Sequence, residues 1–249
     1  MSAPAAPLAV RGLEAGYEGV AVVHDVDLHV QAGEVVALLG ANGAGKTTTL
    51  LTLSGLIPRL GGEVDVLGVS QARSSRRTAA RHALMLVRRG VRHVPEDRAL
   101  FFGLTGREHL RLAAPPRDRG AIERALAPFP VLEAIIDRRA GLMSGGEQQM
   151  LAIARALVGQ PQLLMIDEMS LGLAPIVVEQ LLPTVAGIAR EHGIGVLLVE
   201  QHVHAVLAVA DRAYVMAQGR ISAEGSAANL AADPARLAGW YLGASSAAE

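Results

Sequence analysis

The strongest constraint on the fold is one octapeptide, "GANGAGKT", which runs from Gly40 to Thr47. It fits the pattern G-x-x-x-x-G-K-[S/T], and it follows the apolar run "VVALL" and precedes a helical segment, which is the context that this pattern needs. Glycines let the backbone curl so that successive N–H groups point at one phosphate, and the N-terminus of the next helix adds partial positive charge. The octapeptide therefore predicts a phosphate-binding loop between a strand and a helix.

The residues of this loop have separate expected roles. Lys46 is expected to reach the β- and γ-phosphates of a nucleotide, and the Thr47 hydroxyl is expected to take one position on Mg²⁺. An ordinary glycine-rich turn is the alternative, but it does not account for strand, loop, Lys, Thr and helix in this order. The predicted nucleotide-binding residues of the loop are Gly40, Ala41, Asn42, Gly43, Ala44, Gly45, Lys46, Thr47 and Thr48.

A pair of carboxylates ends a later apolar run, "LLMIDE". In proteins with a phosphate loop, a carboxylate at the end of such a strand holds Mg²⁺ directly or through water, which makes Asp167 the predicted metal partner. Glu168, beside the metal, can accept a proton from a water that attacks the γ-phosphate. A solvated acidic pair is the alternative, which the upstream loop disfavours. Together the two motifs fit an ATPase, a GTPase, a kinase or a helicase.

Strands and helices alternate along the chain, and no linker rich in Pro or Ser divides it. The runs "VVALL", "LLMI" and "GVLLV" are continuously apolar, as expected of strands covered on both faces, whereas "LAVRGL" and "DVDLHV" alternate like half-exposed strands. A late hairpin is predicted to turn at Gln218 and Gly219. Short helical pieces between about 95 and 141 indicate an insertion into an α/β core. Helices are predicted to begin near Gly45, Gly146, Pro175 and Gln201.

The composition limits the classes of partner. The 249 residues carry a formal net charge of −1, which gives no overall attraction to nucleic acid or anionic lipid. There is no cysteine, so disulfides and thiolate metal sites are excluded. The Arg-rich stretch "ARSSRRTAARHALMLVRRGVR" lacks interleaved aromatics and is expected to be a solvated helix face. The apolar runs are far shorter than the roughly 20 residues that cross a bilayer, so we expect a soluble chain that meets a membrane through a partner.

The stretch that decides among the nucleotide-binding classes is "MSGGEQQMLAIARAL", residues 143–157. It closely resembles the "LSGGQ" signature of the ATP-binding cassette (ABC) family, with Met143 at the usual Leu and Glu147 at the usual Gln. The resemblance covers nearly the whole chain. It implies that the nucleotide is ATP, bound with Mg²⁺, and that the chain is an ATPase.

The same resemblance gives further residues their expected roles. Tyr17 matches the aromatic residue that stacks on adenine, and residues 170–173 stand where the family has its D-loop. His202 follows the strand "GVLLVE" and matches the switch histidine, so Glu168 and His202 are the expected catalytic residues. A lone Tyr is usually a packing residue and a lone His near a helix start is usually a cap; only their order and spacing favour the functional roles.

The resemblance also implies an architecture. ABC cassettes are α/β P-loop NTPase domains with a mixed sheet core, an N-terminal antiparallel β portion and an inserted helical subdomain. Residues 1–249 would form one such nucleotide-binding domain. Residues of about 8–94 and 158–242 would make the core, and residues of about 95–157 would make the helical subdomain with the signature.

The signature gives the chain a second helix start that seeks an anion, and one ATP does not need both. In ABC proteins two cassettes meet head to tail. The signature residues that are expected to close on ATP held by the other cassette are Ser144, Gly145, Gly146 and Glu147. A serine N-cap followed by glycines is the alternative, which explains the helix start but not its place among the motifs.

Finer features resemble the LivF-type ATPases of bacterial branched-chain amino acid importers, namely "HVPEDRALF", "SLGLAP" and the tail "ADRAYVMAQGRISAEG". Glu96 stands where most ABC ATPases have a glutamine that touches Mg²⁺ and couples the site to membrane subunits, and a carboxylate can serve the same ion. The expected metal ligands are thus Thr47, Glu96 and Asp167. Asp97 replaces the usual Gly of this group and His93 its usual Tyr, in the region where a membrane partner would dock.

The resemblance implies a peripheral subunit on the cytoplasmic face of the cell membrane. It would hydrolyse MgATP to drive import of branched-chain amino acids through separate permease subunits, beside a second cassette, identical or sister, and indirectly with a solute-binding protein. No nucleic acid is expected as a partner. Urea or amide import and lipopolysaccharide export are alternatives within the class. A non-transport ABC ATPase that acts on DNA or ribosomes, and a P-loop kinase or GTPase, are alternatives outside it.

Overall fold

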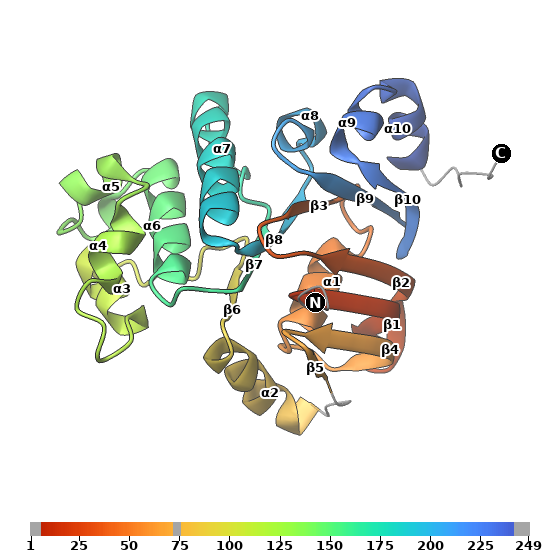
Figure 1. Cartoon of the computed structure of the whole chain (residues 1–249), viewed down its shortest axis with the longest axis horizontal. Coiled ribbons are helices and arrows are strands. Elements are labelled where there is room, and N and C mark those ends of the chain that lie inside the picture. The colour runs from red at the N-terminus through yellow and green to blue at the C-terminus, as the bar shows by residue number, and fades with distance from the viewer. Residues whose placement is uncertain (1–5, 72–75, 242–249) are drawn as a thin grey trace, which may run out of the picture.

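The computed structural model describes residues 6–71 and 76–241, which form two β-sheets and a group of helices set to one side (Figure 1). The first sheet is antiparallel, with strand order β2-β1-β4-β5. Its burial alternates along the strands, as the sequence predicts for half-exposed strands. Its strands are β1 (Leu8–Tyr17), β2 (Val20–Val30), β4 (Arg59–Val66) and β5 (Val69–Ser70).

The second sheet has the order β10-β9-β3-β8-β7-β6, and its neighbours are parallel except for the β9–β10 pair. Every residue of β3, β7 and β8 is buried, which confirms the prediction of strands covered on both faces. The predicted hairpin is also confirmed, because Gln218 and Gly219 turn between β9 and β10 with φ of 49° and 78°. The strands are β3 (Val35–Leu39), β6 (Val91–Val94), β7 (Leu163–Asp167), β8 (Gly195–Glu200), β9 (Arg212–Ala217) and β10 (Arg220–Ser226).

Helices cover the second sheet and build the inserted subdomain. Elements α3 to α6 lie together at one end of the molecule, away from the antiparallel sheet (Figure 1). Helices α1 and α6 begin within one residue of the predicted starts at Gly45 and Gly146, and α7 begins at Pro175 as predicted. The helix predicted near Gln201 begins at Val203. The helices are α1 (Lys46–Leu53), α2 (Arg76–Arg88), α3 (Gly106–Ala113), α4 (Ala121–Leu126), α5 (Pro130–Ala134), the 3₁₀ turn η1 (Ala140–Leu142), α6 (Gly145–Leu157), α7 (Pro175–His192), α8 (Val203–Leu207), α9 (Ala227–Ala231) and α10 (Pro234–Tyr241).

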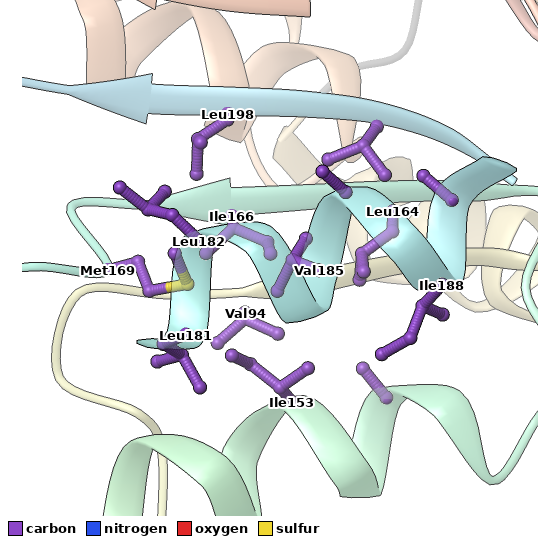
Figure 2. Packing of buried hydrophobic residues seen from close by; sticks show 14 of the residues in the cluster. Val94, Ile153, Leu164, Ile166, Met169, Leu181, Leu182, Val185, Ile188 and Leu198 are labelled. Carbon is purple, nitrogen blue, oxygen red and sulfur yellow. The ribbon is translucent and has the colours of Figure 1, made fainter. Parts of the chain in front are cut away.

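One apolar core joins the inserted helices to the second sheet. Figure 2 shows Ile153 of α6 and Val185 of α7 among side chains of β7 and β8, such as Ile166 and Leu198. All four are at most 2% exposed, and full burial of such a side chain is worth about 1.5–3 kcal/mol. The helix that follows the signature motif is therefore packed against the same core that carries the strands of the site.

The Arg-rich stretch forms α2, and its Arg81 and Arg88 are exposed, as expected of a solvated face. The first residues of that stretch, 72–75, and the predicted core boundary at 242 lie outside the described residues. Within the described ranges, no helix is both long enough and apolar enough to span a membrane.

Candidate nucleotide-binding site

The loop between β3 and α1 takes a course that requires glycine at two places. A Cβ on Gly40 would lie 2.3 Å from the carbonyl oxygen of Met216, so a side chain there would push the loop away from β9. Gly45 precedes α1 in the left-handed region, with φ of 106°. Because glycine has no side chain to cap the helix, the free N–H groups of the first turn of α1 are left for a ligand at this loop.

Lys46 is buried at the start of α1, with 4% of its side chain exposed. Its Nζ donates to the carbonyl oxygens of Gly40 at 2.8 Å and Ala41 at 3.1 Å, and Oε1 of Glu168 lies 3.7 Å away. Burial lowers the pKa of Lys46, and the charges of Glu168 and Asp167 oppose this shift. The ammonium is therefore fixed beside the loop, where the phosphates of a nucleotide are expected.

Asp167 ends β7 and is 2% exposed, and its Oδ1 has no hydrogen-bond partner within the described chain. Burial raises the pKa of Asp167 to about 6; Glu168 and Glu96 add to this shift, whereas the nearby Thr47 hydroxyl opposes it.

These residues fit the predicted Mg²⁺. A buried carboxylate oxygen without a partner, next to a hydroxyl, supplies the hard oxygen ligands that this ion prefers. Within the described residues, no three His, Asp or Glu side chains gather into a site that could hold a metal by themselves. Mg²⁺ usually takes one or two protein carboxylates and completes its shell with phosphate oxygens and water, so Asp167 and Thr47 suffice on the protein side.

Glu168 leaves β7 in a strained backbone conformation, with φ of 43°. Its N–H donates to the carbonyl oxygen of Val199 on β8 at 2.9 Å, which holds the strained turn in place. Such a conformation costs about 1–3 kcal/mol for a residue with a side chain and persists where the surroundings enforce it. The turn directs the carboxylate toward Lys46, where it can accept a proton from a water beside a bound phosphate.

A cleft of about 440 Å³ brings the loop and the carboxylate together. Its walls include Asn42, Lys46, Thr47, Glu96, Glu168 and Gln201. A neighbouring cleft shares Thr47 and Glu96 and adds Asp167. Thr47 and Glu96 therefore stand between the predicted metal side and the predicted catalytic side of one site.

After β8, Gln201 lines the cleft, whereas the sequence suggests His202 for this place. Strand β8 runs to Glu200, which pairs with Leu39 of β3, and the next residue, Gln201, lines the cleft. His202 is exposed and stands at the N-cap of α8. The role expected of His202 stays a prediction, and Gln201 is a second candidate for it that the sequence did not single out.

Tyr17 stands at the end of β1 with 44% of its side chain exposed. Its hydroxyl lies 3.5 Å from Oγ1 of Thr48 in the first turn of α1. An exposed ring beside the phosphate loop is available for stacking on a base. The structure thus brings the predicted adenine-binding residue next to the predicted phosphate-binding residues.

The signature begins α6 with a capping box. Ser144 Oγ accepts a hydrogen bond from the N–H of Glu147 at 3.3 Å, and the Glu147 carboxylate accepts one from the N–H of Ser144 at 2.7 Å. Arg138 lies 3.5 Å from the same carboxylate. Glu147 is therefore committed to the helix start, and the Ser144 hydroxyl proton remains free to be donated.

The signature does not line the cleft of its own chain. None of residues 143–147 is among the described residues that form the walls around Lys46. Its two glycines lie beside the segment after Glu168 and the start of α7: a Cβ on Gly145 would lie 3.4 Å from Leu173, and one on Gly146 would lie 2.9 Å from Val177. The two glycine-rich helix starts are thus separate features of one chain.

A phosphate loop, a buried carboxylate beside a threonine and a glutamate turned toward the loop lysine define a P-loop nucleotide-binding domain. The chain belongs to the ABC transporter family, which residues 23–170 match. It is an ABC ATPase domain, as the resemblance of its signature implies.

Two relatives and one solved structure illustrate the likeness. The chain is 40% identical to the high-affinity branched-chain amino acid transport ATP-binding protein BraG of Pseudomonas aeruginosa, over 91% of this chain and 95% of BraG. It is 34% identical to the probable branched-chain amino acid transport ATP-binding protein LivF of Archaeoglobus fulgidus, over 88% and 91%. A solved ATP-binding subunit of an ABC transporter superposes with a TM-score of 0.76 at 32% identity, covering 96% of this chain and 95% of that one.

Proposed function

We propose that this chain hydrolyses MgATP to drive the uptake of branched-chain amino acids through separate membrane permease subunits. It would act peripherally on the cytoplasmic face of the membrane. The observation that carries the ATPase part is the convergence of Lys46, Thr47 and Glu168 on one cleft, with Asp167 adjoining. The transported solute is inferred from BraG and LivF, which match nearly the whole chain.

The residues of the cleft divide the work of hydrolysis. The Lys46 ammonium would bind the β- and γ-phosphates, and Asp167 and Thr47 would hold Mg²⁺, which supplies charge neutralisation at those phosphates. The Glu168 carboxylate would accept the proton of the attacking water at one of its oxygens. Gln201 and His202 are the candidates for a contact with the γ-phosphate, and Gln201 lines the cleft.

We further propose that two cassettes close head to tail. Ser144 and the first residues of α6 do not line the cleft around Lys46 of their own chain, and a helix N-terminus with a serine cap attracts an anion. A second cassette, identical or sister, would bring its ATP to this helix start.

We propose that the permease binds beside the Glu96 loop. Phe101 and Phe102 are each 64% exposed and Leu142 is 72% exposed. They come from two adjacent segments, because the N–H of Gly141 donates to the carbonyl oxygen of Phe102 at 3.1 Å. Large apolar side chains grouped in water favour a protein partner, and here they adjoin the loop that enters the nucleotide cleft.

The ATPase part is tested with the purified chain. Lys46→Ala removes a charge-assisted contact of about 1.5–3 kcal/mol, so ATP affinity or hydrolysis should fall at least about tenfold. Glu168→Gln keeps the shape but cannot take up the proton, so ATP should still bind while turnover falls about 10²-fold or more. Arg81→Ala, which removes an exposed cation of α2, is the matched control. Calorimetry and phosphate release measure both steps, and unchanged values in the Lys46 and Glu168 variants would contradict the assignment.

The transport part is tested in vesicles that contain the chain, a second cassette and the permease subunits that co-purify with it. We expect ATP-dependent uptake of labelled leucine, isoleucine and valine that Glu168→Gln abolishes. Uptake of urea or acetamide in place of these amino acids would assign the chain to the alternative importers.

A further inference from the structure

We propose that Arg98 is a positioning residue that holds the start of the signature helix and the segment after Glu168 in register with the loop of residues 95–99. This inference rests on the proposed function, because the signature helix affects catalysis only if it completes the site of a second cassette. It concerns how a displacement of the loop of residues 95–99, which contains Glu96, is transmitted to Ser144.

The loop of residues 95–99 is strained and held from outside. Arg98 and Ala99 are consecutive residues in the left-handed region, with φ of 63° and 46°. Arg155 of α6 donates to both of their carbonyl oxygens, at 3.0 Å and 2.6 Å. Two residues with side chains rarely share this conformation, so these bonds from the signature helix fix the shape of the loop.

The Arg98 guanidinium in turn binds the N-terminal part of α6. Its Nε donates to Oε1 of Gln149 at 2.9 Å, and its Nη1 lies 3.2 Å from Oε1 of Gln148. Gln149 is 2% exposed, so the first of these bonds is sheltered from water. The loop is thus fastened to the first and third turns of one helix, and the two parts are expected to move together.

A third donor extends the network to the segment after the catalytic glutamate. Nη2 of Arg98 donates to the carbonyl oxygen of Leu171 at 3.3 Å. The same nitrogen would lie 3.8 Å from a Cβ on Gly145, so the guanidinium stands beside the first residue of α6. Leu171 also lines the cleft around Lys46. One side chain of the 95–99 loop therefore touches both the start of α6 and the segment after Glu168.

The last step of the path leads to the signature serine. Gln148, which accepts from Arg98, donates from its Nε2 to the carbonyl oxygens of Ala140 and Met143 at 3.0 Å and 3.2 Å. Met143 is the residue before the helix cap, Ser144. A displacement of the 95–99 loop would thus be carried through Arg98 and Gln148 to the backbone that presents the Ser144 hydroxyl.

This role requires arginine. The guanidinium is a rigid planar fork whose nitrogens reach separate acceptors, whereas the lysine ammonium is a point charge on a flexible stem. Arg98→Lys should therefore keep the charge and lose the simultaneous grip on Gln148, Gln149 and Leu171. Arg98 lines the neighbouring cleft that contains Asp167 but not the cleft around Lys46, so we expect the contact of Lys46 with ATP to survive both changes.

The test measures ATP affinity, ATP-driven association of cassettes and turnover in parallel, with ATP as the probe. Arg98→Ala and Arg98→Lys are compared with Arg107→Ala, which removes another arginine fork of the helical subdomain, paired with exposed Asp137. Association is followed in the Glu168→Gln background. We expect ATP affinity to stay within about twofold and the turnover number and association constant to fall about tenfold or more for Arg98→Ala, with Arg98→Lys equally impaired. Arg107→Ala should match the wild type.

A cycle of single and double variants separates positioning from general stability. If Arg98 acts through Gln148, the double variant Arg98→Ala/Gln148→Ala should be no worse in turnover than Arg98→Ala alone. Wild-type turnover in both Arg98 variants, or losses in Arg98→Ala that merely follow its melting temperature, would overturn the proposal. If the Arg98 variants give this contrary result while the wild-type chain hydrolyses ATP, only the role of Arg98 is wrong and the proposed function stands. A wild-type chain without ATP hydrolysis or association would overturn both.

Discussion

The Glu200 carboxylate binds Ser170 twice, accepting hydrogen bonds from its N–H at 2.8 Å and from its hydroxyl at 2.5 Å. Both residues are buried, with 1% and 4% of their surface exposed. Burial raises the pKa of Glu200, and these bonds from Ser170 oppose the shift. The end of β8 therefore anchors the first residue of the segment that leads from Ser170 to α7, and Leu173 of this segment lies against Gly145 at the start of the signature helix.

We expect Glu200→Ala to loosen this anchor. It leaves two buried donors of Ser170 without a partner, so the free energy of unfolding should fall by about 1.5–3 kcal/mol. Turnover should fall with it, because residues 170–173 would no longer be held against Gly145. Glu200→Gln can still accept from the N–H and donate to the hydroxyl oxygen, so it should lie close to the wild type. Chemical denaturation and phosphate release at saturating ATP measure the two effects, and a wild-type turnover number in a folded Glu200→Ala would contradict the anchoring role.

The cleft geometry makes a prediction about the two residues that follow β8. Gln201→Ala should lower turnover about tenfold, because it removes a polar group that faces the phosphates, with little change in ATP affinity. His202→Ala should have the smaller effect, because that side chain is exposed. Steady-state hydrolysis of the two variants side by side decides between them. A larger loss in His202→Ala would return the switch role to the histidine.

Acid stability should depend on His93. Burial lowers the pKa of His93 to about 4 from an ordinary value of 6.5, against the opposing charge of Asp97. The unfolded chain therefore takes up a proton on this residue at a higher pH than the folded chain does. The stability that the folded chain keeps while His93 is neutral in both states is complete above about pH 6.5 and is lost as the pH falls toward 4.

The variant His93→Phe isolates that effect. Between pH 7 and pH 5 the wild type should lose about 1–2 kcal/mol more of its free energy of unfolding than the variant does. Urea denaturation at a series of pH values measures the difference. Parallel curves for the two proteins would show that His93 titrates normally in the folded chain.

The parts of the site that are local in sequence could be predicted, and those that depend on packing could not. The phosphate loop and the Asp167–Glu168 pair follow from short-range order, because strand, turn and helix adjoin each other there. The choice between Gln201 and His202 did not follow. Every residue of β8 is buried, so no alternation in the sequence marks where the strand ends and which side chain turns into the cleft.

The hydrogen bonds of Arg98 could not be predicted from the sequence for a related reason. Its acceptors lie about 50 and 73 positions further along the chain, and only the packing of α6 against the second sheet brings them together. The sequence placed residues 96–98 in a docking region without showing that their arginine points inward. The capping box at Ser144, by contrast, needs only residues 144 and 147, and the pattern S-x-x-E shows it directly.

The most direct test of the central claim, that each signature helix completes the site of the other cassette, mixes two inactive variants. Ser144→Arg should block closure over the nucleotide of the partner while ATP still binds to the loop around its own Lys46, and Lys46→Ala should lose that loop instead. In a head-to-tail pair, one composite site then carries both defects and the other carries neither. We predict that ATP hydrolysis reappears when equal amounts of the two variants are mixed under conditions in which wild-type cassettes pair. A mixture as inactive as either variant alone would contradict the account.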